Sequence, residues 1–165
     1  MTLVNMAGTK QPVSVLVVIY TSDLDVLLLE RADHSGYWQS VTGSREGDDT
    51  LRDTAIREVQ EETGLEANQY ELNDWQFQNH YEIYPHWQHR YPAGVTQNVE
   101  HVFGLRLPCR VAITLSPREH LNYQWLPLQE AADKVFSPSN RAMILEIASR
   151  GMSKTLVKSS LRGTL

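Results

Sequence analysis

The sequence predicts a fold of the α/β (α+β) class, in which one β-sheet is flanked by helices. Runs rich in β-branched and other apolar residues recur at 13–20, 25–32 and 99–107, and runs of this length are typical of buried strands. Between them, residues 50–63 repeat their apolar side chains at the helical period of about 3.6 residues. The sequence therefore mixes sheet and helix within one chain of 165 residues.

The remaining elements are predicted in chain order. The first two strands are separated by the turn residues Thr21, Ser22 and Asp23, so we expect a hairpin. Residues 37–44 are expected to bring a short strand to the start of the helix at 50–63. Further along, we expect a half-exposed pair of strands within 70–84, the strand at 99–107, a loop at 115–119, a strand at 122–128, a short helix at 128–135 and a terminal helix from 140 to about 149.

The length of the chain favours a single domain over residues 1–150, because it supports one proper core and no repeat or interior linker divides it. Residues 1–9 are expected to be a loose terminus. Residues 151–165 are rich in Ser, Thr and Lys and contain no acidic residue, so a flexible, solvated tail is predicted there.

Charge and cysteine content limit the partners and the compartment. The net charge of −5 gives no indication of nucleic-acid or anionic-membrane binding. The apolar run at 13–19 is too short to span a bilayer. Cys109 is the only cysteine, which excludes an internal disulfide and fits a reducing compartment. We expect Cys109 to serve as a small packing residue. We interpret the chain as cytoplasmic, and its sequence does not predict an oligomeric state.

The helix at 50–63 has clear start and stop signals. Thr50 followed three residues later by Asp53 has the form of a capping box, and Gly64 is the usual residue just beyond a helix end. An apolar stripe along this helix predicts the face that packs on the sheet; its members are Leu51, Ala55, Ile56 and Val59.

Three glutamates stand beside this stripe. Glu58, Glu61 and Glu62 are spaced at i, i+3 and i+4, so they project from one side of the helix near the core. A solvated acidic face is one interpretation. The other is a site for Mg²⁺ or Mn²⁺, because clustered hard oxygen ligands suit these ions and a preceding glycine loop brings the backbone close to a ligand.

The spacing across this loop and helix matches a known signature. It reads Gly, five residues, an acidic residue, seven residues, then Arg-Glu-hydrophobic-any-Glu-Glu-any-Gly-hydrophobic. In this the chain resembles the Nudix hydrolase superfamily, whose box has Glu at the position of Asp49 here. The matching residues are Gly43, Asp49, Arg57, Glu58, Val59, Glu61, Glu62, Gly64 and Leu65.

The resemblance implies the Nudix fold, a mixed β-sheet sandwiched between α-helices, and metal-dependent cleavage of a phosphoanhydride. It implies metal ligands at Glu58, Glu62 and Glu119, with these residues and Glu61 catalytic. The box residues Gly43, Asp49, Arg57 and Gly64 are expected to be structural, with the acidic residue bracing the loop against the arginine. Substrate contacts are implied at Lys10, Arg31, Thr42, Tyr81, Glu82, Ile83, Tyr84, His120 and Ser137.

Outside the box, further short segments resemble one branch of the family, at residues 12–14, 17–20, 38–44, 89–91, 94–96, 119–121, 125–126 and 139–141. This resemblance over residues 10–147 implies hydrolysis of dihydroneopterin triphosphate to a monophosphate and pyrophosphate. In that case Lys10 and Arg31 offset phosphate charge. Tyr81 and Tyr84 would stack on the bicyclic ring, and Glu82 would accept hydrogen bonds from ring N–H groups.

Other interpretations remain open. A pyrophosphohydrolase acting on dATP or oxidised purine nucleotides would need a similar stacking pocket. A Nudix-like module that binds a ligand without catalysis is a further alternative, although such modules usually lack a box glutamate. The aromatic segment 80–95 is expected to be a substrate loop or a packed surface loop, and His86 and His89 are spaced so that metal binding is a third possibility.

Overall fold

The computed structural model describes residues 9–163, and describes side chains as far as residue 150. Its centre is a seven-stranded sheet with the order β3-β2-β1-β6-β5, in which β4 also pairs with β1 and β7 with β2. Only β1 and β6 run parallel among the described strands, so the sheet is mixed. The strands are β1 (Val13–Thr21), β2 (Asp25–Arg31), β3 (Trp38–Gln39), β4 (Val41–Ser44), β5 (Glu71–Glu82), β6 (Gln97–Leu107) and β7 (His120–Pro127).

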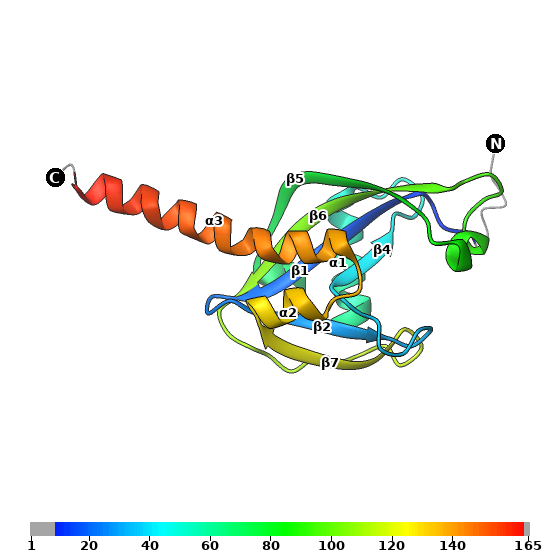
Figure 1. The fold of residues 1–165 in the computed structure, drawn as a ribbon, viewed down its shortest axis with the longest axis horizontal. Helices are drawn as coiled ribbons and strands as arrows, with labels where there is room; N and C mark the ends of the chain where they lie inside the picture. Colours follow the sequence, from blue (N-terminus) through cyan, green and yellow to red (C-terminus); the bar gives the residue numbers. More distant parts are fainter. Residues whose placement is uncertain (1–8, 164–165) are drawn as a thin grey trace.

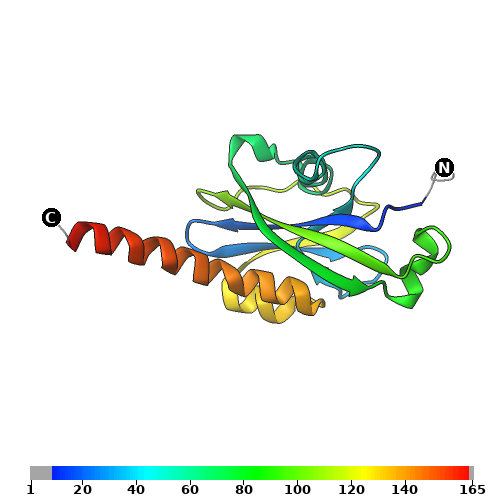
Figure 2. The ribbon, with the colours of Figure 1, turned by 90° about the horizontal axis from the view of Figure 1, so that it is seen from above.

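Helices cover both faces of this sheet (Figures 1 and 2). Helix α1 (Leu51–Thr63) packs on one face, while α2 (Leu128–Lys134) and α3 (Pro138–Gly163) pack on the other. Two 3₁₀ helices, η2 (Ala67–Gln69) and η3 (Pro85–Arg90), flank strand β5. Among the described residues, no helix is long and apolar enough to cross a membrane. The expected sandwich of a mixed sheet between helices is confirmed.

Strand β1 supplies side chains to both cores. Val15 and Val17 pack in the cluster beneath α1, whereas Leu16 and Val18 pack in the cluster beneath α2 and α3. Successive side chains of a strand point to opposite faces, and a strand buried on both faces therefore reads as an uninterrupted apolar run. The expected hairpin between β1 and β2 is present, with Tyr20 opposite Val26.

Strand β5 differs from the sequence expectation. Residues 70–84 were expected to contain two strands, but one strand of 12 residues pairs with β6 on both sides of an unpaired stretch at 75–77. The pairing shifts register between Asp74 and Gln78, and Gln76 has a positive φ of 54°. A bulge leaves extra residues unpaired and so disturbs the alternation of exposed and buried side chains, which explains why one strand looked like two.

Helix α3 and Cys109 also differ from expectation. The helix expected to end near residue 149 continues to Gly163, so residues 151–163 are helical where a flexible tail was expected (Figure 1). Gly151 costs the helix only about 1 kcal/mol relative to alanine and no proline follows it, so it does not end the helix.

The prediction that Cys109 is a packing residue is wrong, because its side chain is exposed. The loose terminus predicted at residues 1–9 lies, apart from Thr9, outside the described residues.

Candidate active site

Helix α1 begins and ends where the sequence predicts. The Thr50 hydroxyl accepts a hydrogen bond from the Asp53 backbone N–H at 3.0 Å, which caps the first turn. Gly64 has a φ of 77° and its N–H donates to the carbonyl of Gln60 at 2.9 Å, which ends the last turn. These two caps set the helix length, and its last two turns carry the glutamates.

The three box glutamates have different environments. The side chains of Glu58 and Glu62 are 9% and 3% exposed, whereas that of Glu61 is 46% exposed. Glu58 lies directly against strand β4, since a Cβ added at Gly43 would come 1.9 Å from its Cδ. A glycine is required at that position because the carboxylate fills the space of a side chain. The structure thus brings Glu58 and Glu62 together inside the protein and leaves Glu61 at the surface.

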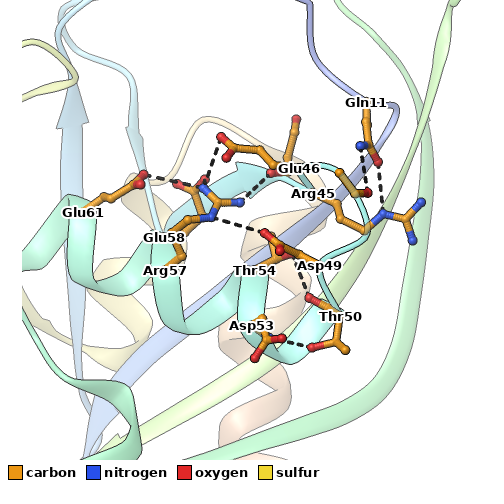
Figure 3. A network of polar contacts seen from close by, with 12 residues as sticks. Gln11, Arg45, Glu46, Asp49, Thr50, Asp53, Thr54, Arg57, Glu58 and Glu61 are labelled. Carbon is orange, nitrogen blue, oxygen red and sulfur yellow. Dashed lines mark hydrogen bonds and ion pairs between the residues drawn. The ribbon is translucent and has the colours of Figure 1, made fainter. Parts of the chain in front are cut away.

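Arg57 links the helix to the preceding loop (Figure 3). Its Nη1 donates to Oε1 of Glu58 at 2.8 Å, and its Nη2 donates to the Ser44 carbonyl at 3.1 Å. The ion pair of Arg57 with Asp49 is 3.7 Å long, beyond hydrogen-bond distance, and the buried Nε of Arg57 has no hydrogen-bond partner. Glu46, which the sequence did not single out, lies 3.5 Å from Arg57. The loop carboxylates of Glu46 and Asp49 therefore lie near Arg57, but neither is within close hydrogen-bond distance of it.

Burial makes the Glu58–Glu62 pair electrostatically expensive. It raises the pKa of Glu58, with the nearby Arg57 opposing the shift. It raises the pKa of Glu62 well above the usual range, and repulsion from Glu58 and Glu119 adds to the shift. Oε1 of Glu62 has no hydrogen-bond partner among the described residues. A positive ligand placed between these groups would remove most of this cost.

His120 lies beside the pair and does not supply that charge. Its Nε2 is 3.7 Å from Oε1 of Glu62, but burial lowers the pKa of His120 to about 4, with Arg31 adding to the shift. The imidazole is therefore neutral near pH 7. His120 was expected to touch substrate, and the structure places it next to the carboxylates and not among the residues that line the cavity described below.

The carboxylates offer hard oxygen donors of the kind that bind divalent cations. Within the described residues, no three His, Cys, Asp or Glu side chains are grouped as a ready cage for a metal. Glu61 turns toward Arg57, 3.7 Å away, and Glu119 lies on an exposed loop, close enough to raise the pKa of Glu62. The set fits an ion that takes its remaining ligands from water and from a bound anion.

A cavity of about 390 Å³ lies on the other side of strand β4. Eight of the expected substrate-contact residues line it, namely Lys10, Arg31, Thr42, Tyr81, Glu82, Ile83, Tyr84 and Ser137. The pairing of β4 with β1 explains why neighbouring residues of β4 face opposite sides of the sheet. Gly43 pairs with Val15, which faces α1, while Thr42 pairs with Leu16, which faces α3. One short strand therefore separates the carboxylate pair from the cavity.

One end of the cavity is cationic and rigid. Arg31 donates to both carboxylate oxygens of Asp33 at 2.7 Å and to Gln39 at 3.0 Å, and its guanidinium lies 4.3 Å from the centre of the Trp87 ring. Arg90, which the sequence analysis missed, donates to the same Asp33 at 2.8 Å. The Arg31 hydrogen bond is the main reason why the pKa of Asp33 falls to about 2. The two arginines are thus held in place before any ligand arrives.

Lys10 connects this cationic end to the carboxylates. Burial lowers its pKa, and the nearby Arg90 and Arg31 lower it further. Glu58 and Glu62 act in the opposite direction on the pKa of Lys10, which places the ammonium within the field of both groups. A polyanion lying along Lys10 would therefore reach from the cavity toward the carboxylate pair.

Aromatic side chains form the wall of the cavity. The rings of Tyr84 and Trp87 meet edge to face with centroids 5.4 Å apart, and Phe136 lies 6.3 Å from Tyr84 and 6.0 Å from Trp87. His86 packs against Trp87 at 4.4 Å, within the 3₁₀ helix η3. The aromatic segment therefore forms the rim of the cavity, as expected of a substrate loop, and Phe136 was not foreseen.

Another part of the cavity lining is polar. The Asn98 amide donates to the hydroxyls of Ser14 at 2.7 Å and Tyr81 at 3.1 Å, and burial is the main reason that the pKa of Tyr81 is raised. Glu100 also lines the cavity, and burial raises its pKa to about 7. The only signal of this wall in the sequence is that the apolar alternation of the strand at 99–107 is imperfect at its start.

Comparison with known proteins gives consistent matches. A family model described as a NUDIX domain matches residues 10–147. The dihydroneopterin triphosphate diphosphatase of Escherichia coli K12 is 46% identical over 138 residues, which cover 82% of this chain and 91% of that enzyme. The enzyme of the same name from Haemophilus influenzae is 39% identical over 142 residues, 84% of this chain and 89% of the relative.

A solved structure agrees with these sequence matches. The E. coli dihydroneopterin triphosphate pyrophosphohydrolase superposes with a TM-score of 0.79 at 45% identity, covering 84% of this chain and 95% of that chain. The NUDIX domain of Shewanella oneidensis NrtR, at 17% identity and a TM-score of 0.67, shares the fold.

Proposed function

Because this chain belongs to the Nudix family, we propose that it hydrolyses dihydroneopterin triphosphate to dihydroneopterin monophosphate and pyrophosphate. The proposal depends most on one observation. Lys10 lines the cationic end of an aromatic-walled cavity, and its pKa responds to the charges of the buried carboxylates Glu58 and Glu62. A ring carrying a triphosphate has the matching order of groups, with a flat bicycle at one end and a polyanion at the other. Cys109, the only cysteine, supports a reducing location such as the cytoplasm.

In this proposal the cationic end holds the phosphate chain. Asp33 accepts from Nε and Nη2 of Arg31 and Gln39 accepts from Nη1, so one N–H on each Nη remains for phosphate oxygens and the guanidinium is fixed in direction. Lys10 adds a point charge between the two arginines and the carboxylates. Little side-chain freedom is lost when the substrate binds, because Asp33, Gln39 and Trp87 already hold Arg31.

The carboxylate pair would hold a divalent cation, Mg²⁺ or Mn²⁺, with Glu119 as the third ligand. When bound, such an ion neutralises charge on the phosphates and lowers the pKa of a bound water. Oε1 of Glu62, which lacks a hydrogen-bond partner, or the carboxylate of Glu119 accepts the proton of the attacking water. Arg57 holds Glu58 in position through its 2.8 Å bond. Glu61 is exposed and contributes mainly by its ion pair with Arg57.

The aromatic wall would bind the ring. Tyr84, Trp87 and Phe136 lie within 6.3 Å of one another at the rim, where a planar bicycle can stack. Stacking alone does not separate a pterin from a purine. A pyrophosphohydrolase acting on dATP or oxidised purine nucleotides is therefore the second candidate, and the polar wall near Glu100 has to make the distinction.

Incubation of the protein with Mg²⁺ and a substrate panel tests the proposal. Dihydroneopterin triphosphate, dATP, dGTP and ADP-ribose are supplied in turn, and pyrophosphate release is measured against orthophosphate release. We expect the highest kcat/KM for dihydroneopterin triphosphate, with pyrophosphate as the product. A higher value for dATP would favour the second candidate, and binding without turnover of any substrate would indicate a non-catalytic module.

A further inference from the structure

One carboxyl group of the cavity has not yet been assigned a contact with the substrate. Glu100 is 5% exposed, lines the cavity and lies opposite Ser14 in the parallel pairing of β6 with β1. It is two residues from Val102, which packs in the core beneath α3, so both side chains are on that face of the sheet. Glu100 is therefore on the ring side of strand β4, away from Glu58.

The surroundings of Glu100 satisfy this carboxyl only in part. The Asn79 amide donates to its Oε1 at 3.3 Å, and Glu100 forms no ion pair within the part of the chain that the structure describes. The charge of Glu100 acts on two nearby tyrosines, Tyr81 and Tyr91, and helps to raise their pKa values. Burial raises the pKa of Glu100 to about 7, against the hydrogen bond from Asn79. A buried carboxylate in such a place needs donors from elsewhere.

The ring of the proposed substrate can supply these donors. A pterin has a 2-amino group beside the N3–H, which gives two parallel N–H donors with the spacing that a carboxylate accepts from a guanidinium. Adenine has an N6 amino group beside the N1 acceptor, so one carboxylate oxygen would meet a lone pair. A buried carboxylate therefore favours a 2-amino-4-oxo ring over adenine.

We propose that Glu100 determines ring specificity by accepting two hydrogen bonds from the 2-amino-4-oxo edge of the bound ring. This rests on the proposed function, because it assumes that the ring occupies the cavity beside the aromatic rim. Glu82 is the other carboxylate of the cavity that could contact the ring. It also lines the cavity, but it is exposed and its Oε1 accepts from Gln97 at 3.3 Å. Water competes for an exposed acceptor, so Glu82 discriminates less.

The test compares Glu100→Gln with Glu82→Gln and with the exposed control Glu66→Gln, which makes no side-chain cap bond at η2. The measured quantity is the ratio of kcat/KM for dihydroneopterin triphosphate to that for dATP. We expect Glu100→Gln to lower this ratio by about 10²-fold, since one charged hydrogen bond is lost and the amide matches adenine. Glu66→Gln should leave it unchanged. An unchanged ratio in Glu100→Gln, or a larger change in Glu82→Gln, would overturn the inference.

A ring analogue tests the same contact in the unaltered protein. Removing the 2-amino group from the substrate should lower kcat/KM of the wild type by about 10-fold or more, and should have little further effect in Glu100→Gln. Equal losses in both proteins would show that Glu100 does not touch that group. If the wild type fails to hydrolyse any ring triphosphate, the proposed function fails. Suppose instead that the wild type hydrolyses them, but Glu100→Gln changes neither the ratio of kcat/KM values nor the effect of removing the 2-amino group. In that case only the role of Glu100 fails.

Discussion

Strand β4 separates two regions that handle charge in opposite ways. On the α1 side, Gly43 admits Glu58, and two buried carboxylates repel each other. On the α3 side, Thr42 faces a cavity where Lys10 and Arg31 are positive. Each region alone is electrostatically unfavourable. Together they suit a substrate that carries its own negative charge and binds a cation, so the site is complete only when both ligands are present.

The strongest test of the carboxylate side is Glu62→Gln. We expect kcat to fall by about 10³-fold with saturating Mg²⁺, because a metal ligand and proton acceptor is lost. We also expect the free energy of unfolding in EDTA at pH 7.5 to rise, because burial raises the pKa of Glu62 and its charged form opposes folding. Steady-state kinetics and thermal unfolding measure the two effects. Glu61→Gln is the matched control, and an equal loss of kcat there would contradict the distinction between buried and exposed glutamates.

Gly43→Ala should damage the carboxylate side more than the ring pocket, although Gly43 also lines the cavity. The new methyl group would lie 1.9 Å from the Glu58 Cδ, so the carboxylate must move. A displacement of this size is expected to lower kcat by about 10²-fold. The affinity for dihydroneopterin itself, measured by calorimetry, should stay within a few-fold of wild type. A large loss of ring affinity would mean that the two sides of β4 are not independent.

Glu100→Gln should change the pH dependence of stability. The folded pKa of about 7 lies above the unfolded value of 4.5, so the native state binds more protons between these pH values and loses stability as pH rises through them. Above pH 7 the wild type should therefore be less stable than the variant by roughly 3 kcal/mol. The difference should vanish below pH 4.5. Urea unfolding from pH 4 to pH 8 measures it, and a constant difference would contradict the assignment.

Asp33→Asn should weaken phosphate binding at the cationic end of the cavity. Of these four substitutions, it should have the smallest effect. Without the carboxylate, Arg31 and Arg90 lose the bonds of 2.7 and 2.8 Å that orient them. We expect KM for the triphosphate to rise by about 10-fold while kcat changes less, because charge remains but positioning is lost. The same KM for wild type and variant would mean that Asp33 does not orient the arginines. The ring-only ligand dihydroneopterin serves as the control.

Sequence motifs and tertiary structure contributed unequally to the two sides. The box, the cap at Thr50, the stop at Gly64 and the buried stripe of α1 could all be read from one short stretch. The cavity draws on segments from Lys10 to Asn140. Of its polar groups, Arg90 and Glu100 were missed, because neither has a local pattern that separates it from a surface charge.

By itself, the sequence determined the fold class, the limits of α1 and the identity of the box. These follow from helical periodicity and end-capping hydrogen bonds, which act between residues a few positions apart. Only the tertiary structure decided that Glu58 and Glu62 are buried while Glu61 is exposed, that β5 is one bulged strand, and that Glu100 faces a cavity. Burial and the charges it brings together depend on packing between distant segments, and no short stretch of sequence contains that information.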